Sequence, residues 1–187
     1  MEGPRVGVSR RDIRRVDFLI FVTVGNAIQG FDRLLKEIEV LRKTGFLEGE
    51  VLVQYGHSRF LPCGCSCVPS LARDEFPKYI AEASLVITHA GAGSIGHCIR
   101  LGKKPVVVPR RKEYREHVND HQLELVRELD AQGRIYAAFD VSDLRSAIET
   151  ALSSGTTQPF LKKQAGVHII VENYLADLSK RIRKNTI

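Results

Sequence analysis

The stretch from Ser84 to Pro109 most limits what this chain can fold into. It opens with the short apolar run Leu85–Ile87, passes through a glycine-rich turn, continues with apolar residues at helical spacing, and ends in a second apolar run. A strand, a tight turn, a helix and a second strand form one βαβ unit, in which the two strands are parallel. The sequence therefore predicts a parallel sheet.

The rest of the chain repeats this alternation of strands and helices. The expected strands are Phe18–Val24, Val51–Gln54, Leu85–Ile87, Pro105–Pro109 and Ile135–Phe139, with a short further strand possible at the cysteines. The expected helices are Phe31–Lys43, Asp74–Ala83, Ile95–Leu101, His121–Asp130, one from Asp140 or Ser142 to Leu152, and Pro159–Arg183. This alternation predicts an α/β fold with a Rossmann-like parallel sheet, preceded by a basic arm at residues 1–16 and filling residues 17–187 as one domain.

The glycine-rich turn is the first candidate site. It comprises His89, Ala90, Gly91, Ala92, Gly93 and Ser94. Glycines let the backbone turn sharply and approach a ligand closely, and the helix that follows offers free N–H groups and a positive dipole end. An exposed phosphate gains roughly 0.3–1 kcal/mol per charge there. The alternative is a turn that only connects two elements.

The same turn also matches the dinucleotide fingerprint G-x-G-x-x-G, from Gly91 to Gly96. That fingerprint requires an acidic residue at the end of the next strand to hold the ribose, and Arg110 and Arg111 stand there instead. Arginines can receive the extra phosphate of NADP, so an NADP-binding protein remains an alternative.

A second polar cluster extends from Glu116 to Gln122. Asp120, His121 and Gln122 lie at an expected helix start and suit the hydroxyls of a sugar, while capping of the helix by Asn119 or Asp120 is the alternative. Adjacent side chains on a helix diverge by about 100°, which disfavours a metal site. Ligands bind beyond the carboxyl ends of parallel strands, so the residues at those ends should share one cleft: Gly25–Asn26, Gln54–Tyr55, His89–Ser94 and Arg110–Arg111.

Charge and cysteine content narrow the class of protein. The net charge of +6 is concentrated at the two ends, where it could meet nucleic acid, anionic lipid or an acidic partner, or only aid solubility. No nucleic-acid motif accompanies it. The lack of a long apolar run and of a signal core predicts a cytoplasmic protein. Cys63, Cys65 and Cys67 are expected to be free thiols on a strand face, with zinc binding alongside His57 as the alternative.

Four segments together resemble the C-terminal domain of family 28 glycosyltransferases: FVTVGNAIQGFDRLL, VITHAGAGSIG, LGKKPVVVPR and EHVNDHQLE. The resemblance covers about residues 17–150. It is nearest to small, free-standing versions of the domain. These are the soluble subunit of the eukaryotic UDP-GlcNAc transferase and the glucuronosyl- and galactosyltransferase subunits of bacterial exopolysaccharide and capsule synthesis.

This resemblance implies the donor-binding half of an enzyme with the GT-B fold. Gly91–Ser94 would cradle the diphosphate of a UDP-sugar, Asp120–Gln122 would contact the sugar, and Gly25 and Asn26 would face the other half. Relatives carry a ribose-holding glutamate where this chain has His97, and usually a threonine near Asn26. The residues expected to contact the nucleotide sugar are Gly25, Asn26, His89, Ala90, Gly91, Ala92, Gly93, Ser94, His97, Arg110, His117, Asp120, His121 and Gln122.

The resemblance also implies how the chain would work. The enzyme would invert the anomeric centre without a metal or cofactor, and its catalytic base would lie in a separate membrane-bound subunit that binds a lipid-linked saccharide. The chain would then sit at the cytoplasmic face of the membrane through that partner. Because His97 replaces the ribose-holding residue, a non-catalytic subunit that stimulates a partner glycosyltransferase is the alternative.

Overall fold

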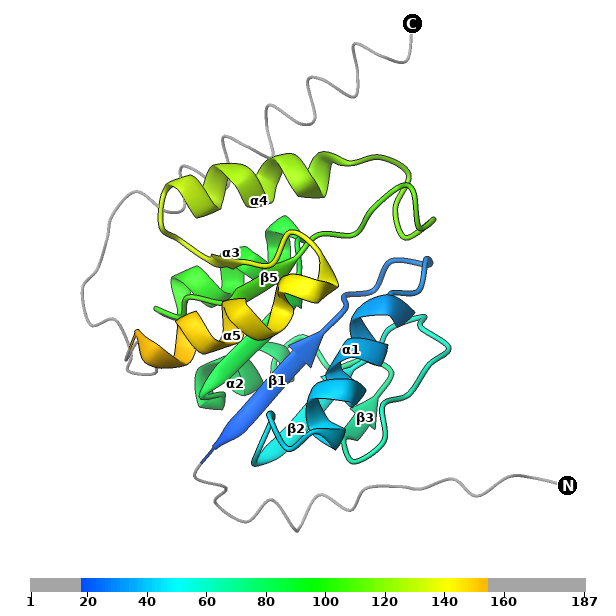
Figure 1. Cartoon of the computed structure of the whole chain (residues 1–187), viewed down its shortest axis with the longest axis vertical. Coiled ribbons are helices and arrows are strands. Elements are labelled where there is room, and N and C mark those ends of the chain that lie inside the picture. The colour runs from blue at the N-terminus through cyan, green and yellow to red at the C-terminus, as the bar shows by residue number, and fades with distance from the viewer. Residues whose placement is uncertain (1–17, 155–187) are drawn as a thin grey trace, which may run out of the picture.

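The computed structural model describes residues 18–154, which form a six-stranded sheet between two layers of helices (Figure 1). The strands are β1 (Leu19–Thr23), β2 (Glu50–Gln54), β3 (Ser66–Val68), β4 (Leu85–His89), β5 (Val106–Val108) and β6 (Tyr136–Ala137). They lie in the order β3-β2-β1-β4-β5-β6, and every neighbouring pair is parallel. This is the doubly wound Rossmann order, whose direction reverses between β1 and β4. The predicted fold class is confirmed.

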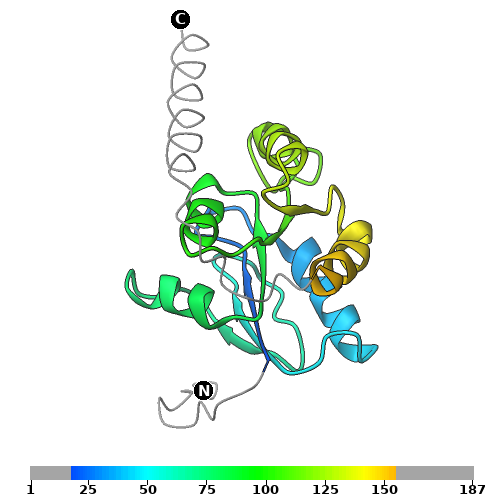
Figure 2. The same ribbon diagram turned by 90° about the vertical axis from the view of Figure 1, so that its left-hand side faces the viewer.

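Helices cover both faces of this sheet, as Figure 2 shows. They are α1 (Asp32–Lys43), α2 (Glu75–Glu82), α3 (Ala92–Arg100), α4 (His121–Ala131) and α5 (Leu144–Ser153), with a short 3₁₀ helix, η1 (Val141–Asp143), before α5. Alternate residues of each strand point to opposite faces, so Ile20 and Val22 pack under α1 and α5, whereas Phe21 packs under α2. Strands buried on both faces explain the near-continuous apolar runs of the sequence.

The observed elements follow the predicted ones with small differences. The last strand is limited to Tyr136–Ala137, and the short strand at the cysteines is β3. Asp74, expected to cap α2, makes no capping bond with its side chain; its carboxylate lies 3.0 Å from Nζ of Lys78 instead. The predicted arm at residues 1–16 and the predicted helix at 159–183 lie outside the described residues.

The cysteines of residues 18–154 are all free thiols. Cys65 and Cys67 pack against the edge of the core, as expected for small residues on a strand face, and Cys63 is exposed. Within this range no group of three or more His, Cys, Asp or Glu side chains is arranged to hold a metal ion. None of the helices described is both long and apolar enough to cross a bilayer.

Candidate functional site

Three loops meet at the carboxyl edge of the sheet: β1–α1 (residues 24–31), β4–α3 (residues 90–91) and β5–α4 (residues 109–120). The register of the strands explains their proximity, because Thr23 at the end of β1 lies opposite Gln54 on one side and Thr88 on the other. The arrowhead of β1 in Figure 1 points to this edge. The switch in strand order falls here, which is where open α/β sheets bind ligands.

The first turn of α3 offers backbone N–H groups without acceptors. Gly91 precedes the helix and cannot cap it with a side chain, and the first amide bonded back to it is that of Ile95, at 3.0 Å. The amides of Ala92, Gly93 and Ser94 have no hydrogen-bond partner among residues 18–154. Gly93 is exposed, and a Cβ atom built on it meets no atom within 4 Å. A helix start of this kind suits an anion such as a phosphate.

The imidazole of His89 fills the space between two loops. A Cβ atom added to Gly91 would lie 2.2 Å from Nε2 of His89, and one added to Gly25 would lie 2.5 Å from its Cε1. Gly25 also has a φ of +74°, whereas Gly91 has a φ of −80°, which other residues adopt readily. A glycine is therefore needed at position 91 because a Cβ atom would clash with His89, and not because the backbone conformation requires it. This corrects the prediction that Gly91 serves to turn the backbone sharply.

His89 is uncharged in this position. Burial lowers its pKa to about 3, and the nearby positive charge of Arg110 adds to this effect, while a hydrogen bond with the backbone of Thr23 opposes it. The Thr88 hydroxyl donates to the His89 carbonyl at 3.0 Å and lies 3.5 Å from Nδ1 of the ring. A neutral, enclosed imidazole sets the spacing of the two loops and adds no positive charge to the site.

A chain of polar side chains holds the start of the β1–α1 loop. Thr23 donates to Oε1 of Gln54, whose amide nitrogen donates to Oδ1 of Asn26 at 2.7 Å. The amide of Gly25 donates to the Thr23 hydroxyl at 3.2 Å. The sequence placed Asn26 and Gln54 at this edge, but nothing in it pointed to the bonds that orient them.

The end of the β5–α4 loop and the first turn of α4 hold the residues expected to contact the sugar. Asp120 accepts at Oδ1 from the Lys112 amide, and Gln122 accepts at Oε1 from the Arg110 amide, both at 3.0 Å. Both side chains therefore keep one polar group, Oδ2 of Asp120 and the amide NH₂ of Gln122, with no hydrogen-bond partner in the described range. These two groups are available to a ligand.

The start of α4 is capped by Asn119 and not by Asp120. Oδ1 of Asn119 accepts from the His121 amide at 3.3 Å, whereas the side chain of Asp120 makes no capping bond. Nδ1 of His121 lies 3.5 Å from Oε2 of Glu124 along the helix. Nδ1 of His117 lies 3.1 Å from the Asn119 carbonyl, which orients this ring within the loop. His117 and His121 thus lie in the same loop and helix start as Asp120.

Arg110 is one of the residues predicted to contact the nucleotide sugar, but its side chain is buried among the loops. It is 1% exposed, and its guanidinium donates to the carbonyls of Val24 (2.6 Å), Gln29 (2.7 Å), Gly30 and Glu116 (both 3.1 Å). Burial lowers its pKa to about 10, so it keeps its charge at neutral pH. Arg110 is enclosed as a brace for the loops, which also removes it as a contact for the extra phosphate of NADP.

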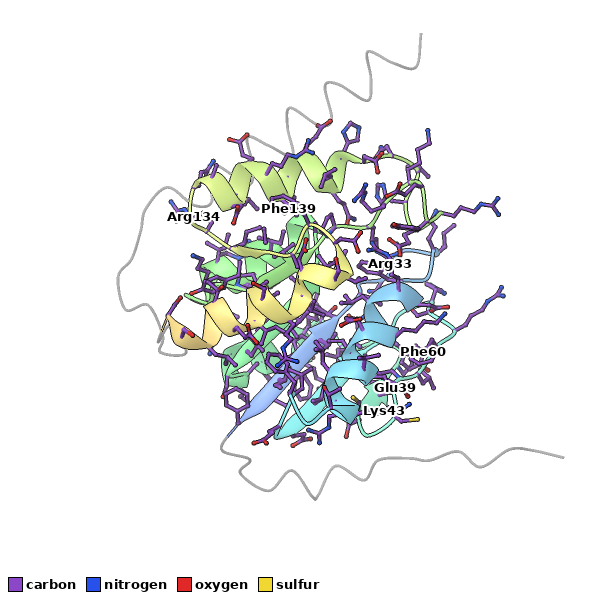
Figure 3. All side chains as sticks on the ribbon, in the orientation of Figure 1. Arg33, Glu39, Lys43, Phe60, Arg134 and Phe139 are labelled. Carbon is purple, nitrogen blue, oxygen red and sulfur yellow. The ribbon has the colours of Figure 1, made fainter. Side chains whose placement is uncertain are left out.

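An ion pair that the sequence did not predict lies beside Arg110. Nε and one terminal nitrogen of Arg33 lie 3.0 Å from the two carboxylate oxygens of Glu116, and the other terminal nitrogen lies 3.2 Å from Asp140. Figure 3 shows Arg33 at the end of α1 that faces these loops. Burial alone lowers the pKa of Arg33, but the hydrogen bond and charge of Glu116 outweigh it and leave the pKa raised. Residues 83 positions apart carry no local signal for this pairing.

His97 lies one turn into α3. Its Nδ1 is 2.9 Å from the carbonyl of Gly93, and its ring packs edge-on against Phe76 with 5.7 Å between the ring centres. Because a carbonyl can only accept, Nδ1 carries the hydrogen of this contact, and in the tautomer with this single hydrogen Nε2 is an acceptor. His97 can therefore accept one hydrogen bond from a hydroxyl, where the glutamate of the relatives has two carboxylate oxygens.

The chain is similar in sequence to known glycosyltransferases. The model of the glycosyltransferase family 28 C-terminal domain matches residues 19–182. The UDP-N-acetylglucosamine transferase subunit ALG13 of Yarrowia lipolytica is 30% identical over 139 residues, which are 67% of each chain. The human protein of the same name is 30% identical over 128 residues, which are 63% of this chain but 11% of the human one.

Solved structures share the fold at lower identity. Acinetobacter baumannii MurG superposes with a TM-score of 0.53 at 18% identity, over 83% of this chain and 49% of that one. The glycosyltransferase of kitacinnamycin superposes with a TM-score of 0.52 at 17% identity, over 96% of this chain and 48% of its own. The chain thus spans about half the length of both. Because the family model covers most of its residues, this chain belongs to the glycosyltransferase family 28 C-terminal domain family.

Proposed function

We propose that this chain is the donor-binding subunit of a UDP-sugar glycosyltransferase. The observation that carries the proposal is the uncapped first turn of α3, where three successive amides lack acceptors and Gly93 leaves open space above them. Its location at the switch point of the sheet, the family of the chain and the name of its fungal relative all support a nucleotide-sugar ligand.

The first turn of α3 would act on the leaving group. Sugar transfer breaks the bond between the anomeric carbon and the β-phosphate, so negative charge develops on UDP. Amide N–H groups and a helix dipole aimed at that phosphate are already oriented and stabilise this charge without rearranging. Oδ2 of Asp120 and the amide NH₂ of Gln122 would bind sugar hydroxyls, and Nε2 of His97 would accept from the nucleoside. His117 and His121 would complete the pocket.

The acceptor half would come from another chain. We infer a membrane-bound subunit that presents a lipid-linked saccharide and supplies the base of an inverting reaction, in polysaccharide or glycan assembly at the cytoplasmic face of the membrane. Neither a metal nor a cofactor is part of this proposal.

Three large apolar side chains are exposed on the β1–α1 and β5–α4 loops that flank the site: Ile28 (80%), Tyr114 (50%) and Val118 (69%). Their exposure supports a covering partner at this edge.

The variant Gly93→Ala tests the phosphate site without disturbing the fold. The added methyl meets no protein atom, and replacing a helical glycine by alanine should raise the free energy of unfolding by about 0.4–1 kcal/mol. The same methyl would stand where a phosphate must approach the amides. We expect affinity for UDP, measured by calorimetry on the full chain, to fall by about tenfold or more, equivalent to about 1.4 kcal/mol.

The control is Ser146→Ala on the exposed side of α5, which should leave UDP affinity unchanged. If Gly93→Ala binds UDP as tightly as the unmodified chain, the phosphate does not lie on this turn and the proposal fails.

The second candidate function is a non-catalytic subunit that stimulates a partner glycosyltransferase. The presence of His97 favours it, because a neutral imidazole provides one acceptor where a carboxylate provides two oxygens. This candidate requires a partner but no affinity for nucleotide sugars. Calorimetry of the purified chain with UDP-N-acetylglucosamine and other UDP-sugars separates the two, since only the donor-binding subunit should bind any of them.

A further inference from the structure

The β5–α4 loop ends at Asp120, directly before Gln122 in the first turn of α4, and its residues 109–120 form no helix or strand. Three successive backbone amides hold it in place, each through a side chain. Arg110 donates to Gln122 at 3.0 Å, Arg111 donates to Glu116 at 3.1 Å, and Lys112 donates to Asp120 at 3.0 Å. The outer two amides therefore orient the two side chains that we assign to the sugar, and the middle amide is fixed by Glu116.

Glu116 is anchored on all of its polar atoms. Its carboxylate receives two parallel bonds from Arg33 on α1, both 3.0 Å long, and the exposures of the two side chains are 17% for Arg33 and 6% for Glu116. Its carbonyl accepts from Arg110 and its amide donates to the Arg111 carbonyl at 3.2 Å. A paired, planar contact of this kind fixes direction as well as distance.

The anchor also joins two loops. Arg33 lies in the first turn of α1, which follows the β1–α1 loop, and its guanidinium stacks on the ring of Tyr114, 4.4 Å from the ring centre. Arg110 bonds the carbonyls of Gln29 and Gly30 on one loop and of Glu116 on the other. A shift of Glu116 therefore changes the positions of the amides on either side of Arg111.

We propose that Glu116 and Arg33 are positioning residues that determine how tightly the sugar of the donor is held, while the nucleoside diphosphate is held elsewhere. The inference rests on the proposed function and adds to it a division of the site. The β4–α3 turn binds UDP, and the β5–α4 loop, set by the Arg33–Glu116 pair, reads the sugar. Neither residue touches the reacting atoms.

The test is the ratio of two dissociation constants, that of UDP divided by that of a UDP-sugar, measured by calorimetry on the full chain. The probes are UDP and the four donors UDP-N-acetylglucosamine, UDP-glucose, UDP-galactose and UDP-glucuronic acid, and the donor with the largest ratio is used. In Glu116→Gln we expect the ratio to fall about tenfold or more, because small displacements of binding groups are costly. The affinity for UDP itself should stay within about twofold.

Two further variants sharpen the result, one at the anchor and one remote from it. Arg33→Lys keeps the charge but loses the paired contact, and it should lower the ratio by a smaller factor than Glu116→Gln. Glu149→Gln breaks an exposed ion pair with Arg145 on α5, 3.1 Å long, and should leave the ratio unchanged.

Ile148→Val tests whether Glu116 acts only through the stability of the fold. Ile148 is buried in the core, so this change should lower the melting temperature without altering the β1–α1 and β5–α4 loops. If Glu116→Gln resembles Ile148→Val, with a lower melting temperature and an unchanged ratio, or if it weakens UDP and UDP-sugar equally, the inference is overturned. It is also overturned if the unmodified chain binds UDP but all four ratios are close to one. If the unmodified chain binds no UDP at all, it is the proposed function that fails.

Discussion

At the scale of single residues, the least expected feature is that burial keeps the side chain of His89 unprotonated. His89 is the last residue of β4 and belongs to the glycine-rich turn, whose residues are predicted to contact the nucleotide sugar. Its ring is enclosed between Gly25 and Gly91, where it orients the two loops. Its charge state then has a measurable consequence for stability.

We predict that His89 makes the fold sensitive to mild acid. Its pKa is about 3 when folded and about 6.5 when unfolded, so below pH 6.5 the unfolded chain binds a proton that the folded chain does not. This contribution to stability is fully present above pH 6.5 and is lost as the pH falls toward 3. The free energy of unfolding should fall by up to about 1.4 kcal/mol per pH unit because of this residue.

Urea unfolding of the full chain between pH 7 and pH 5 measures that slope. His89→Asn carries no titrating group and should show a shallower slope than the unmodified chain, although it is less stable at pH 7. Equal slopes for the two proteins would show that His89 is protonated in the folded state and that its burial has been misjudged.

At the scale of elements, the sequence predicted the framework better than the site. Apolar runs and helical spacing located β1, β2, β4 and the helices, because these patterns report burial directly. Glycine placement located the turn before α3. The bonds within the β5–α4 loop were not predictable, since Arg33 reads as an ordinary charged residue on a helix and pairs with a partner far along the chain.

Gly91 and His89 should be energetically coupled through the ring of His89. Gly91→Ala forces a Cβ atom to within 2.2 Å of Nε2, so we expect it to destabilise the fold by about 1–3 kcal/mol. In a Gly91→Ala/His89→Ala double variant the clash is absent. Urea unfolding should therefore give a double variant less destabilised than the sum of the single variants.

The same coupling limits what a bulky substitution at Gly91 can show about the phosphate site. Loss of UDP binding in Gly91→Val would follow from displacement of His89 as readily as from a blocked phosphate site, which is why Gly93 is the more informative position. Additive effects of Gly91→Ala and His89→Ala would contradict the packing described for the two loops.

At the scale of the whole molecule, the charged residues are unevenly distributed along the chain. The residues described here, 18–154, contain as many Lys and Arg as Asp and Glu, so the net charge of +6 comes from residues 1–17 and 155–187. The domain itself is therefore neutral, and the exposed apolar side chains beside the site are its more distinctive surface feature.

We predict that Val118→Asp weakens association with the acceptor-binding subunit. Val118 is 69% exposed, so the change should alter the free energy of unfolding by no more than about 0.5 kcal/mol and leave UDP affinity intact. Burying an unpaired carboxylate in an interface is costly, so recovery of the membrane subunit with a tagged chain should fall severalfold. Val40→Asp, at a 50% exposed position on α1, is the matched control. Equal recovery with both variants would place the interface elsewhere.

The buried thiol of Cys98 gives the chain an internal reporter of these events. It lies in the last turn of α3, with no exposed surface, and burial raises its pKa to about 12. An alkylating reagent can reach it only when the helix opens, so its labelling rate measures the frequency of opening, with exposed Cys63 as a fast reference. A ligand seated on the first turn slows that rate by the factor 1 + [L]/Kd, which turns occupancy of the site into a mass-spectrometric signal.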